Sequence, residues 1–413
     1  MHSCLGSSEE TVEKMLRVTP IYGSYGHNPK NESISLPPMC TLIEYGGKRV
    51  IIDVGYDESS SYGDDAKLEM NQSHNEEKNN HTCLDRCQTP TLPEADVVLI
   101  CNSSLSSIGG LPYYCGPKSR KRMIKKYSKI AKMRHGNDKS AATAAAQALV
   151  TLSKPPPIVY GTLPTCKMGQ MSLYDLHANC CLDGGNPGFD LDDIDVVFSP
   201  ERFQTVNYSQ PIVLQNNANN KDTLCVTAHR SAHLVGGCFW VLKRVQDETE
   251  VVVAPIYHHA KEKHLDASTL HKFGATADVL ITRPGGPGGL LSKLYSFDPQ
   301  NLNKQNSSNN RQIQKKKKPI LKPQLVARAE GELIELVMAA LRRGGNVLLP
   351  VDTSGRVLEL LLLLNQYWDK NRLATAYNLC WVGPMTWNTI EYARSQLEWM
   401  ASPLGQQFDS QRG

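Results

Sequence analysis

Apolar runs separated by short polar turns mark the start of the chain as β structure. The segments Leu16–Tyr22, Cys40–Tyr45 and Val50–Val54 have the length and pattern of strands, and we predict that they form an antiparallel meander. The run Ala95–Cys101 (ADVVLIC) is continuously apolar and rich in β-branched residues, as expected of a strand covered on both faces. It ends in a polar segment, Asn102–Ser107, which we predict to be a loop. Loops at such strand ends are where α/β folds place their chemistry.

The hydrophobic period changes after residue 324. Apolar residues then recur with the spacing of a helix, which predicts a helix over Leu325–Arg343 that ends at Gly344-Gly345. We predict a buried strand at Asn346–Val351 (NVLLPV) and a second helix at Gly355–Trp368. This order of elements indicates a second α/β unit.

Three segments are too polar to bury enough apolar surface to offset the entropy of ordering them. They lie near 57–93, near 116–157 and at 301–322. The second carries ten Lys or Arg residues between Lys118 and Lys139 against the single acid Asp138. Its core is either a solvated linker or a basic helix that stands off the domain.

The composition limits which class of protein this is but says little about its activity. The chain has 413 residues, enough for two or three domains, and 45 Lys and Arg against 41 Asp and Glu give a net charge of only +4. Its 12 Cys are mostly isolated and follow no signal peptide, which we expect of a reduced intracellular protein. The most apolar run, Leu358–Leu364, is about a third of the ~20 residues that a membrane-spanning helix needs.

Two basic runs are candidates for nucleic-acid contacts or for nuclear import signals, with a solvated linker as the plainer interpretation. The import signal is slightly favoured. Aromatic residues do not interleave these runs closely enough to stack on bases. The candidate nucleic-acid contacts are basic residues of these two runs together with one arginine further along the chain: Lys121, Arg122, Lys125, Lys126, Lys315, Lys316, Lys317, Lys318 and Arg356.

The segment 352–356 follows the predicted strand and precedes a helix, where hydroxyls and backbone N–H groups can meet a phosphate. The favoured interpretation is a helix N-cap formed by Thr353 or Ser354.

The histidines suggest a metal site, since half of the 12 lie between residues 229 and 271. However, His258-His259 on a strand would point to opposite faces and could not share a metal. A second zinc hypothesis, which lacks a partner pair of ligands, rests on His81, Cys83 and Cys87.

Several sequence blocks together resemble the metallo-β-lactamase and β-CASP proteins of messenger RNA 3′-end processing. The most specific are KMGQM at 167–171, GNVLLPVDTSGRVLEL at 345–360 and SQLEWM at 395–400. The resemblance implies an α/β fold: an αββα metallo-β-lactamase sandwich with an inserted, here truncated, α/β β-CASP domain. We place the sandwich at 15–290 with low-complexity inserts near 57–93 and 116–157, a polar linker at 291–323, and the first part of the β-CASP domain at 324–413.

Active members of this family hold two zinc ions on a loop that reads His-x-His-x-Asp-His-x-Gly-x-Leu-Pro, on a later His and on a bridging Asp. Two such metals activate a water molecule and clamp the phosphate that it attacks. The resemblance places the loop ligands on Asn102, Ser104, Ser106 and Ser107, with Gly109, Leu111 and Pro112 fixing the frame. The later ligand falls on His233, the bridging Asp on Ile256, and the acid that opens the β-CASP region on Arg283. Of the family's metal-site residues in the part covered here, the resemblance leaves only Asp53 and His233.

This pattern predicts that no two-metal centre forms. Changing a group that merely supports a metal ligand costs about 1.4 to 2.7 kcal/mol of binding free energy. Losing five ligands therefore removes at least ~7 to 14 kcal/mol, comparable with the whole ~10 to 16 kcal/mol of a structural zinc site. We expect no metal, no other cofactor and no catalytic residue. A loop that hydrogen-bonds a phosphate through its serines is a weaker alternative to a loop filled by hydroxyls and water.

The resemblance implies a nuclear, non-catalytic subunit of the pre-mRNA 3′-end cleavage and polyadenylation complex, with no membrane association. Such a subunit pairs with the active endonuclease subunit of the same fold, joins scaffold and other subunits, and meets pre-mRNA directly or through the complex. Three alternatives remain: a zinc-dependent RNA endonuclease of the same fold, a direct RNA-binding module whose affinity falls steeply with salt, and the inactive subunit 9 of the integrator complex.

Overall fold

The structure, a computed structural model, describes residues 16–22, 39–56, 93–133, 139–182, 184, 187–214, 223–246, 248–282 and 322–406. Several predictions fall outside these residues: the zinc hypothesis on His81, Cys83 and Cys87, the basic run Lys315–Lys318, Arg283, and most of the polar segments 57–93 and 291–323.

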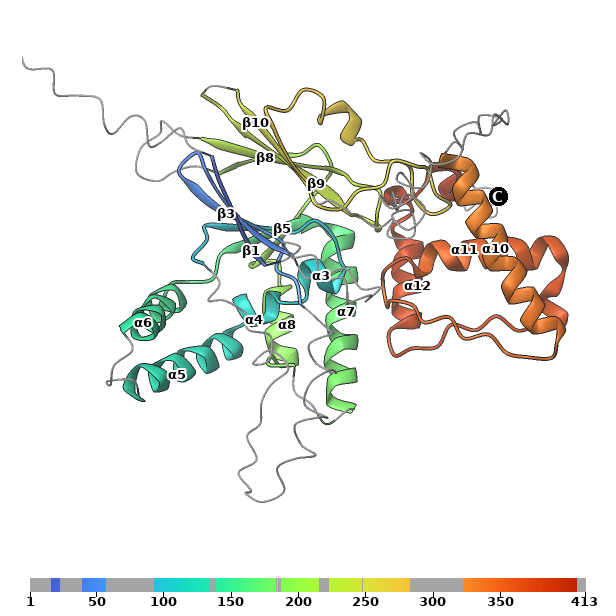
Figure 1. Ribbon diagram of the computed structural model, residues 1–413, viewed down its shortest axis with the longest axis horizontal. Coiled ribbons are helices and arrows are strands. Elements are labelled where there is room, and N and C mark those ends of the chain that lie inside the picture. Colours follow the sequence, from blue (N-terminus) through green and yellow to red (C-terminus); the bar gives the residue numbers. More distant parts are fainter. Residues whose placement is uncertain are drawn as a thin grey trace, which may run out of the picture.

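Two sheets face one another across a shared apolar core (Figure 1). The first has six strands whose spatial order follows the chain: β1 (Arg17–Tyr22), β2 (Cys40–Tyr45), β3 (Lys48–Ile52), β4 (Val97–Leu99), β5 (Ile158–Thr162) and β6 (Phe203–Val206). The second has five strands in the order β11 (Val279–Thr282), β10 (Glu250–Ala254), β9 (Cys238–Arg244), β8 (Leu224–Arg230) and β7 (Pro211–Leu214).

The predicted meander is confirmed. Strands β1, β2 and β3 pair antiparallel, and Gly46 and Gly47 turn the chain between the last two with positive φ angles. Strands β4, β5 and β6 then add in parallel. The apolar run that predicts β4 is buried throughout, because β4 lies between β3 and β5 with a layer on each face.

Helices cover the outer face of the six-stranded sheet: α3 (Leu105–Ile108), α4 (Leu111–Cys115), α7 (Leu163–Leu182) and α8 (Leu191–Val197). Side chains such as Ile100, Ile108 and Phe189 fill the space between them and the sheet. The outer face of the second sheet packs against the 3-10 turn η3 (Leu270–Lys272), whose Leu270 meets Phe239. The fold is the predicted αββα sandwich, and the family's fold class is thereby confirmed.

The region predicted as a polar insert near 116–157 forms a helical hairpin, α5 (Pro117–Met133) and α6 (Lys139–Ser153), that extends away from the sandwich (Figure 1). The alternative of a basic helix therefore holds and the linker interpretation is wrong. Arg120, only 7% exposed, donates from Nη2 to the carbonyl oxygen of Leu152 at 2.9 Å and to that of Lys154. Composition failed here because a buried arginine, which counts as a polar residue, closes the hairpin.

The C-terminal helical unit contains α10 (Lys322–Arg342), α11 (Val357–Asn371), the turn η5 (Leu373–Thr375), α12 (Thr386–Ser395) and the turn η6 (Leu397–Trp399). Both predicted helices are present, and Gly344, with φ of 80°, follows the end of α10. The strand predicted at Asn346–Val351 is wrong: these residues join no sheet, and Leu348 is 89% exposed. An apolar run becomes a strand only beside another strand, and no described strand lies next to this one.

None of the helices among the described residues has the length and apolar character needed to cross a membrane. The domain boundaries given above remain predictions.

Candidate functional site

The site loop, residues 102–110, leaves the carboxyl end of β4 near the middle of the six-stranded sheet. It is not wholly a loop as predicted, because helix α3 begins at Leu105. Three backbone hydrogen bonds fix it to the segment that follows β3: Val54 N to Ser107 O at 2.7 Å, Tyr56 N to Leu105 O at 2.9 Å and Gly110 N to Val54 O at 2.8 Å. The position of the loop is thus set by main-chain contacts.

Asp53 and Gly55, which follow β3, support this arrangement. A Cβ atom on Gly55 would lie 2.0 Å from the backbone oxygen of Ser106, so only glycine allows this close approach. Asp53 has a φ of 59°, an uncommon conformation for a residue other than glycine, and its buried carboxylate accepts a hydrogen bond from Cys101 N at 2.8 Å. Asp53 therefore supports the strand end from which the site loop starts.

The four predicted loop positions are occupied by an amide and three hydroxyl groups. Asn102 Oδ1 accepts hydrogen bonds from Ser104 N at 2.9 Å and from Ser104 Oγ at 2.5 Å. The hydroxyl oxygens of Ser104 and Ser106 lie 2.8 Å apart. Ser107 is completely buried, and its hydroxyl finds no hydrogen-bond partner within the described part of the chain. The loop therefore contains a small hydrogen-bonded network of neutral groups.

His233 lies in the turn between β8 and β9 and is 4% exposed. Its Nδ1 atom has no hydrogen-bond partner among the described residues. Burial, with smaller contributions from Arg356, His258 and His264, lowers the pKa of His233 to about 3. The imidazole is therefore neutral at physiological pH. Ile256, just after β10, is 1% exposed and brings only an alkyl group.

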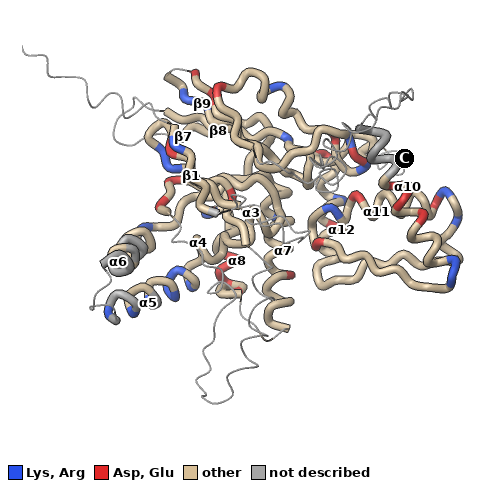
Figure 2. Tube along the Cα trace, in the orientation of Figure 1, with Lys and Arg blue, Asp and Glu red and all other residues tan. Residues whose placement is uncertain are grey.

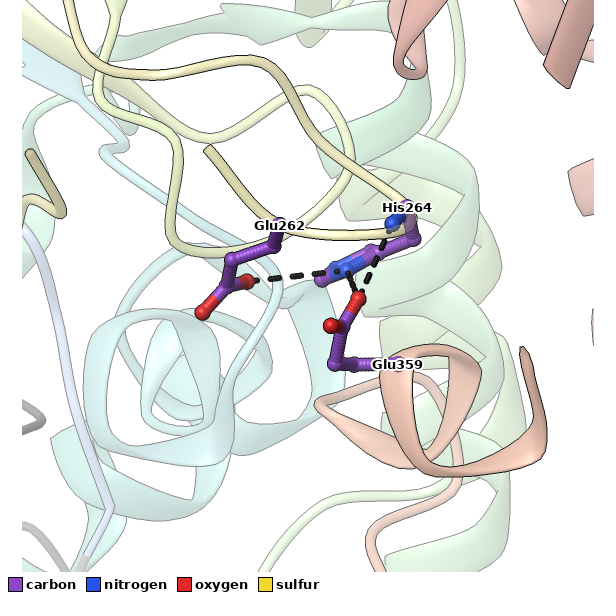
Figure 3. Close-up of side chains that lie close together, drawn as sticks. All are labelled: Glu262, His264 and Glu359. Carbon is purple, nitrogen blue, oxygen red and sulfur yellow. Dashed lines mark hydrogen bonds and ion pairs between the residues drawn. The ribbon is translucent and has the colours of Figure 1, made fainter. Parts of the chain in front are cut away.

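A second polar cluster, which the sequence analysis missed, joins the sandwich to α11 (Figure 3). The carboxylate of Glu359, in the first turn of α11, accepts hydrogen bonds from Lys263 N at 3.1 Å, from His264 N at 2.9 Å and from His264 Nδ1 at 2.7 Å. Burial alone would raise the pKa of Glu359, but the hydrogen bonds from His264 and Lys263 lower it to about 2. The carboxylate is thus held in its charged form.

Arg356 extends this cluster. Its guanidinium group donates two hydrogen bonds to Glu262, at 2.9 and 2.6 Å, and one to the backbone oxygen of His233 at 3.3 Å. Two-pronged arginine–carboxylate pairs are among the stronger ion pairs. We call Glu262, His264, Arg356 and Glu359 the α11 clamp. Arg356, predicted as a nucleic-acid contact, has its guanidinium engaged by Glu262, and that prediction remains untested.

The α11 clamp also suggests a metal centre, since ligand atoms of Glu262, His264 and Glu359 lie within 4.8 Å of one another. The hydrogen bonds argue against it. His264 Nδ1 lies 3.6 Å from Glu262 and 2.7 Å from Glu359, and since a carboxylate can only accept, this nitrogen carries the proton that it donates to Glu359 and offers no lone pair to a metal held by the two carboxylates. The lone pair is then on Nε2, which bonds to neither carboxylate. Both carboxylates already accept charged or backbone donors. We interpret the cluster as an ion-pair clamp.

The hydroxyl groups of Thr353 and Ser354 do not cap α11, contrary to prediction. Ser354 is 5% exposed and its Oγ donates to Met168 O at 3.1 Å, while Thr353 Oγ1 donates to Asp175. Both acceptors belong to α7, the helix that contains the KMGQM block. These hydroxyls attach α11 to α7, because the turn before α11 faces that helix and leaves the N-cap position to Arg356.

The other predicted residues lie apart from the site loop. His258 and His259 follow β10 in a segment outside any strand, so the argument that a strand would point them to opposite faces does not apply. In α5, Arg122 pairs with Asp193 at 3.1 Å, whereas Lys121 and Lys125 are exposed. The side chain of Lys126 lies outside the described residues.

Sequence spacing does not reveal the α11 clamp, since 95 residues separate His264 from Glu359. The signal that could have found it is that Arg356 and Glu359 both fall inside the block at 345–360.

Residues 145–285 match the metallo-beta-lactamase superfamily domain. The chain contains a metallo-β-lactamase domain. Among solved structures, the metallo-beta-lactamase fold protein YhfI from Bacillus subtilis overlaps 64% of this chain and 70% of its own, with 13% identity and a TM-score of 0.26. At that distance the likeness adds nothing to the domain match.

Full-length relatives extend the similarity beyond this metallo-β-lactamase domain. The chain is 27% identical to the probable cleavage and polyadenylation specificity factor subunit 2 of Drosophila melanogaster, over 91% of this chain and 37% of the relative. It is 26% identical to subunit 2 of Oryza sativa subsp. japonica, over 96% of this chain and 39% of the relative. It is 28% identical to cleavage factor two protein 2 of Schizosaccharomyces pombe, over 78% and 32%. The chain thus spans less than two fifths of these relatives.

Proposed function

We propose that this protein is a non-catalytic metallo-β-lactamase subunit of the nuclear machinery that cleaves and polyadenylates pre-mRNA. In this role it binds no pair of zinc ions and cuts no RNA itself. It pairs with the active endonuclease subunit of the same fold, together with scaffold and other subunits, and helps to recognise the polyadenylation signal. The names of its relatives, cleavage and polyadenylation specificity factor subunit 2 and cleavage factor two protein 2, support this role.

The observation that carries the proposal is the chemistry of the groups at the positions where the family resemblance predicts metal ligands. Zinc prefers imidazole, thiolate and carboxylate ligands. Asn102 and the serines of the site loop are neutral, and Asn102, Ser104 and Ser106 already bond to one another. Ile256, where a bridging carboxylate is expected, is buried and apolar. His233 alone supplies an imidazole, so these residues do not fit a two-zinc centre.

One retained side chain has a structural role that needs no metal. The Asp53 carboxylate accepts a hydrogen bond from Cys101 N, whereas His233 bonds to Arg356 only through its backbone oxygen, which any residue would supply. The presence of Asp53 is therefore compatible with a loss of catalysis. A group that positions other elements is kept for packing even where the reaction is gone.

Metal analysis of the purified full chain tests the proposal directly. We expect well under one zinc ion per chain after dialysis against zinc and then buffer, and no cleavage of RNA with or without a chelator. His229→Ala is a matched control, because His229 is a second buried histidine that lies on β8. About two zinc ions per chain, lost in His233→Ala and kept in His229→Ala, would overturn the proposal in favour of a zinc endonuclease.

Co-purification from cells tests the partner. A tagged full chain should recover an endonuclease subunit of the same fold and other polyadenylation factor subunits. Recovery of integrator subunits in their place would assign the chain to the integrator complex. Recovery of neither set from a nuclear extract would remove the basis for the pairing.

A further inference from the structure

Helix α5 carries four exposed lysines along one side, and Figure 2 shows basic residues along this helix. Their spacing of four, four and three residues places them on one face of the helix, over about 16 Å at 1.5 Å per residue. Neither α5 nor α6 contains an acidic residue, and none of the four makes an ion pair within the described residues. We call this set the α5 lysine stripe: Lys121, Lys125, Lys129 and Lys132.

The other basic residues at the start of α5 are already used by the fold. Lys118 pairs with Asp192, and Arg122 pairs with Asp193 at 3.1 Å and with Asp190 at 3.4 Å. Arg120 is buried, where it bonds the end of α6. The base of the hairpin is therefore locally neutralised, whereas the charge of the stripe is not.

The hairpin holds the stripe in a fixed direction. Ser119 Oγ donates to Pro112 O at 2.6 Å, and Lys118 N donates to Asp193 Oδ1 at 2.7 Å. These bonds attach the first turn of α5 to α4 and α8, while the rest of the helix extends away from the sandwich (Figure 1). The lysines thus lie on an ordered arm and not on a collapsed surface.

We propose that the α5 lysine stripe binds the phosphate backbone of single-stranded RNA. The choice of RNA rests on the proposed function, whereas the anionic character of the ligand rests on the stripe itself. Lysine is a compact, strongly hydrated charge without the planar fork that reads carboxylates or base edges. Phosphate contacts of this kind position a strand without reading its sequence. The contact is therefore independent of RNA sequence.

The folded hairpin also distinguishes RNA from an import receptor. A receptor that reads a basic peptide in extended form would require α5 to unwind, and Arg120 and Arg122 to leave their partners. A polyanion binds the stripe as it stands. The structure therefore favours RNA, and receptor binding becomes an outcome of the test.

The salt dependence of affinity gives the expected size of the effect. Each phosphate neutralised on a single strand contributes a slope of about −0.7 to a plot of log K against log salt. Four lysines contribute about −2.8, which corresponds to a roughly fifty-fold loss of affinity between 50 and 200 mM salt.

The experiment measures binding of a 20-nucleotide unstructured RNA to the full chain across this salt range. The test variant replaces all four stripe lysines by glutamine, and a second variant replaces them by arginine. The matched control removes four exposed charges elsewhere: Lys272→Gln, Arg342→Gln, Arg343→Gln and Lys370→Gln. Thermal melting checks that each variant is folded, and binding to an import receptor is measured in parallel.

We expect the glutamine variant to lose at least tenfold in affinity at 100 mM salt and most of the slope. The arginine variant and the control should stay within about threefold of the parent. Parent-like affinity and slope in the folded glutamine variant would overturn the proposal, and so would loss of receptor binding with unchanged RNA binding. Zinc content does not enter this readout, so failure here is distinct from failure of the proposed function.

Discussion

The α11 clamp gives the sharpest test of how the two parts of the chain are held together. Replacing Glu359 by Ala removes the one carboxylate that accepts Lys263 N, His264 N and His264 Nδ1. A hydrogen bond to a charged group contributes about 1.5 to 3 kcal/mol to stability, and three that share one acceptor do not add. We expect Glu359→Ala to lower the free energy of unfolding by about 3 kcal/mol.

The pKa of Glu359 provides an independent check on this magnitude. Its value in the folded chain, about 2 against 4.5, means that folding favours the charged form. That contribution is complete above pH 4.5 and is lost as the pH falls towards 2. The shift is worth at most about 3 kcal/mol, and about 2 kcal/mol after solvent screening is allowed for. The two routes therefore give similar magnitudes.

The assay is urea unfolding of the full chain at pH 7, with hydrogen exchange of residues 262–265 and 356–360 as the local probe. Glu335→Ala is the matched control, since Glu335 is exposed on α10, and it should change stability by less than about 0.5 kcal/mol. A double-mutant cycle with His264→Ala should show about 1 kcal/mol or more of coupling. The reasoning fails if Glu359→Ala behaves like Glu335→Ala, or costs the same with and without His264. A zinc-dependent rise in stability would instead favour a metal centre.

Three further tests concern the sandwich. Gly55→Ala should lower the free energy of unfolding by about 3 kcal/mol or more, because the added Cβ would meet backbone atoms that cannot move away. Gly169→Ala should lower it by about 1 kcal/mol, because the closest contact of its Cβ would be the Cδ1 end of the Ile108 side chain. Equal urea midpoints for the two variants would contradict this. Ile256→Asp should destabilise by about 3 kcal/mol or more by burying an unpaired charge, and a gain of stability with added zinc would reveal a functional metal site. The depressed pKa of His233, about 3 against 6.5, means that the unfolded chain binds the proton more readily, so stability should fall as the pH drops from 6.5 towards 3. This fall should be smaller in His233→Asn, and NMR titration of the His233 ring above pH 5 would refute the burial argument.

The sequence predicts best those strands and helices whose hydrophobic pattern reflects which of their faces are buried in the fold. The run that forms β4 is apolar because layers cover both of its faces, and the spacing in α10 records a single buried side. The segment at 346–351 has the same apolar character without a neighbouring strand. Its pattern predicts burial that the described fold does not supply.

The candidate site divides in the same way. The place of the site loop was predictable, because the apolar run that forms β4 ends just before Asn102. That Asn102 and the serines occupy metal-ligand positions stays a prediction from the family resemblance. The partners were not predictable, because they come from distant parts of the chain. Ser354 bonds to Met168 across 186 residues, and His264 bonds to Glu359 across 95. A helix cap depends only on nearby residues, so the local sequence suggests one at Thr353 or Ser354. In the structure both hydroxyls instead donate hydrogen bonds to α7.

The main-chain support of the site loop has an evolutionary consequence. The bonds that hold it run from Val54, Tyr56 and Gly110 to backbone oxygens, and Cys238 N donates to Cys101 O at 2.7 Å where the loop begins. None of these bonds depends on which side chains the loop carries. Substitutions there can alter reactivity without moving the backbone, whereas a single added methyl group at Gly55 would displace it. Selection can therefore change the chemistry of this loop while its backbone shape is kept.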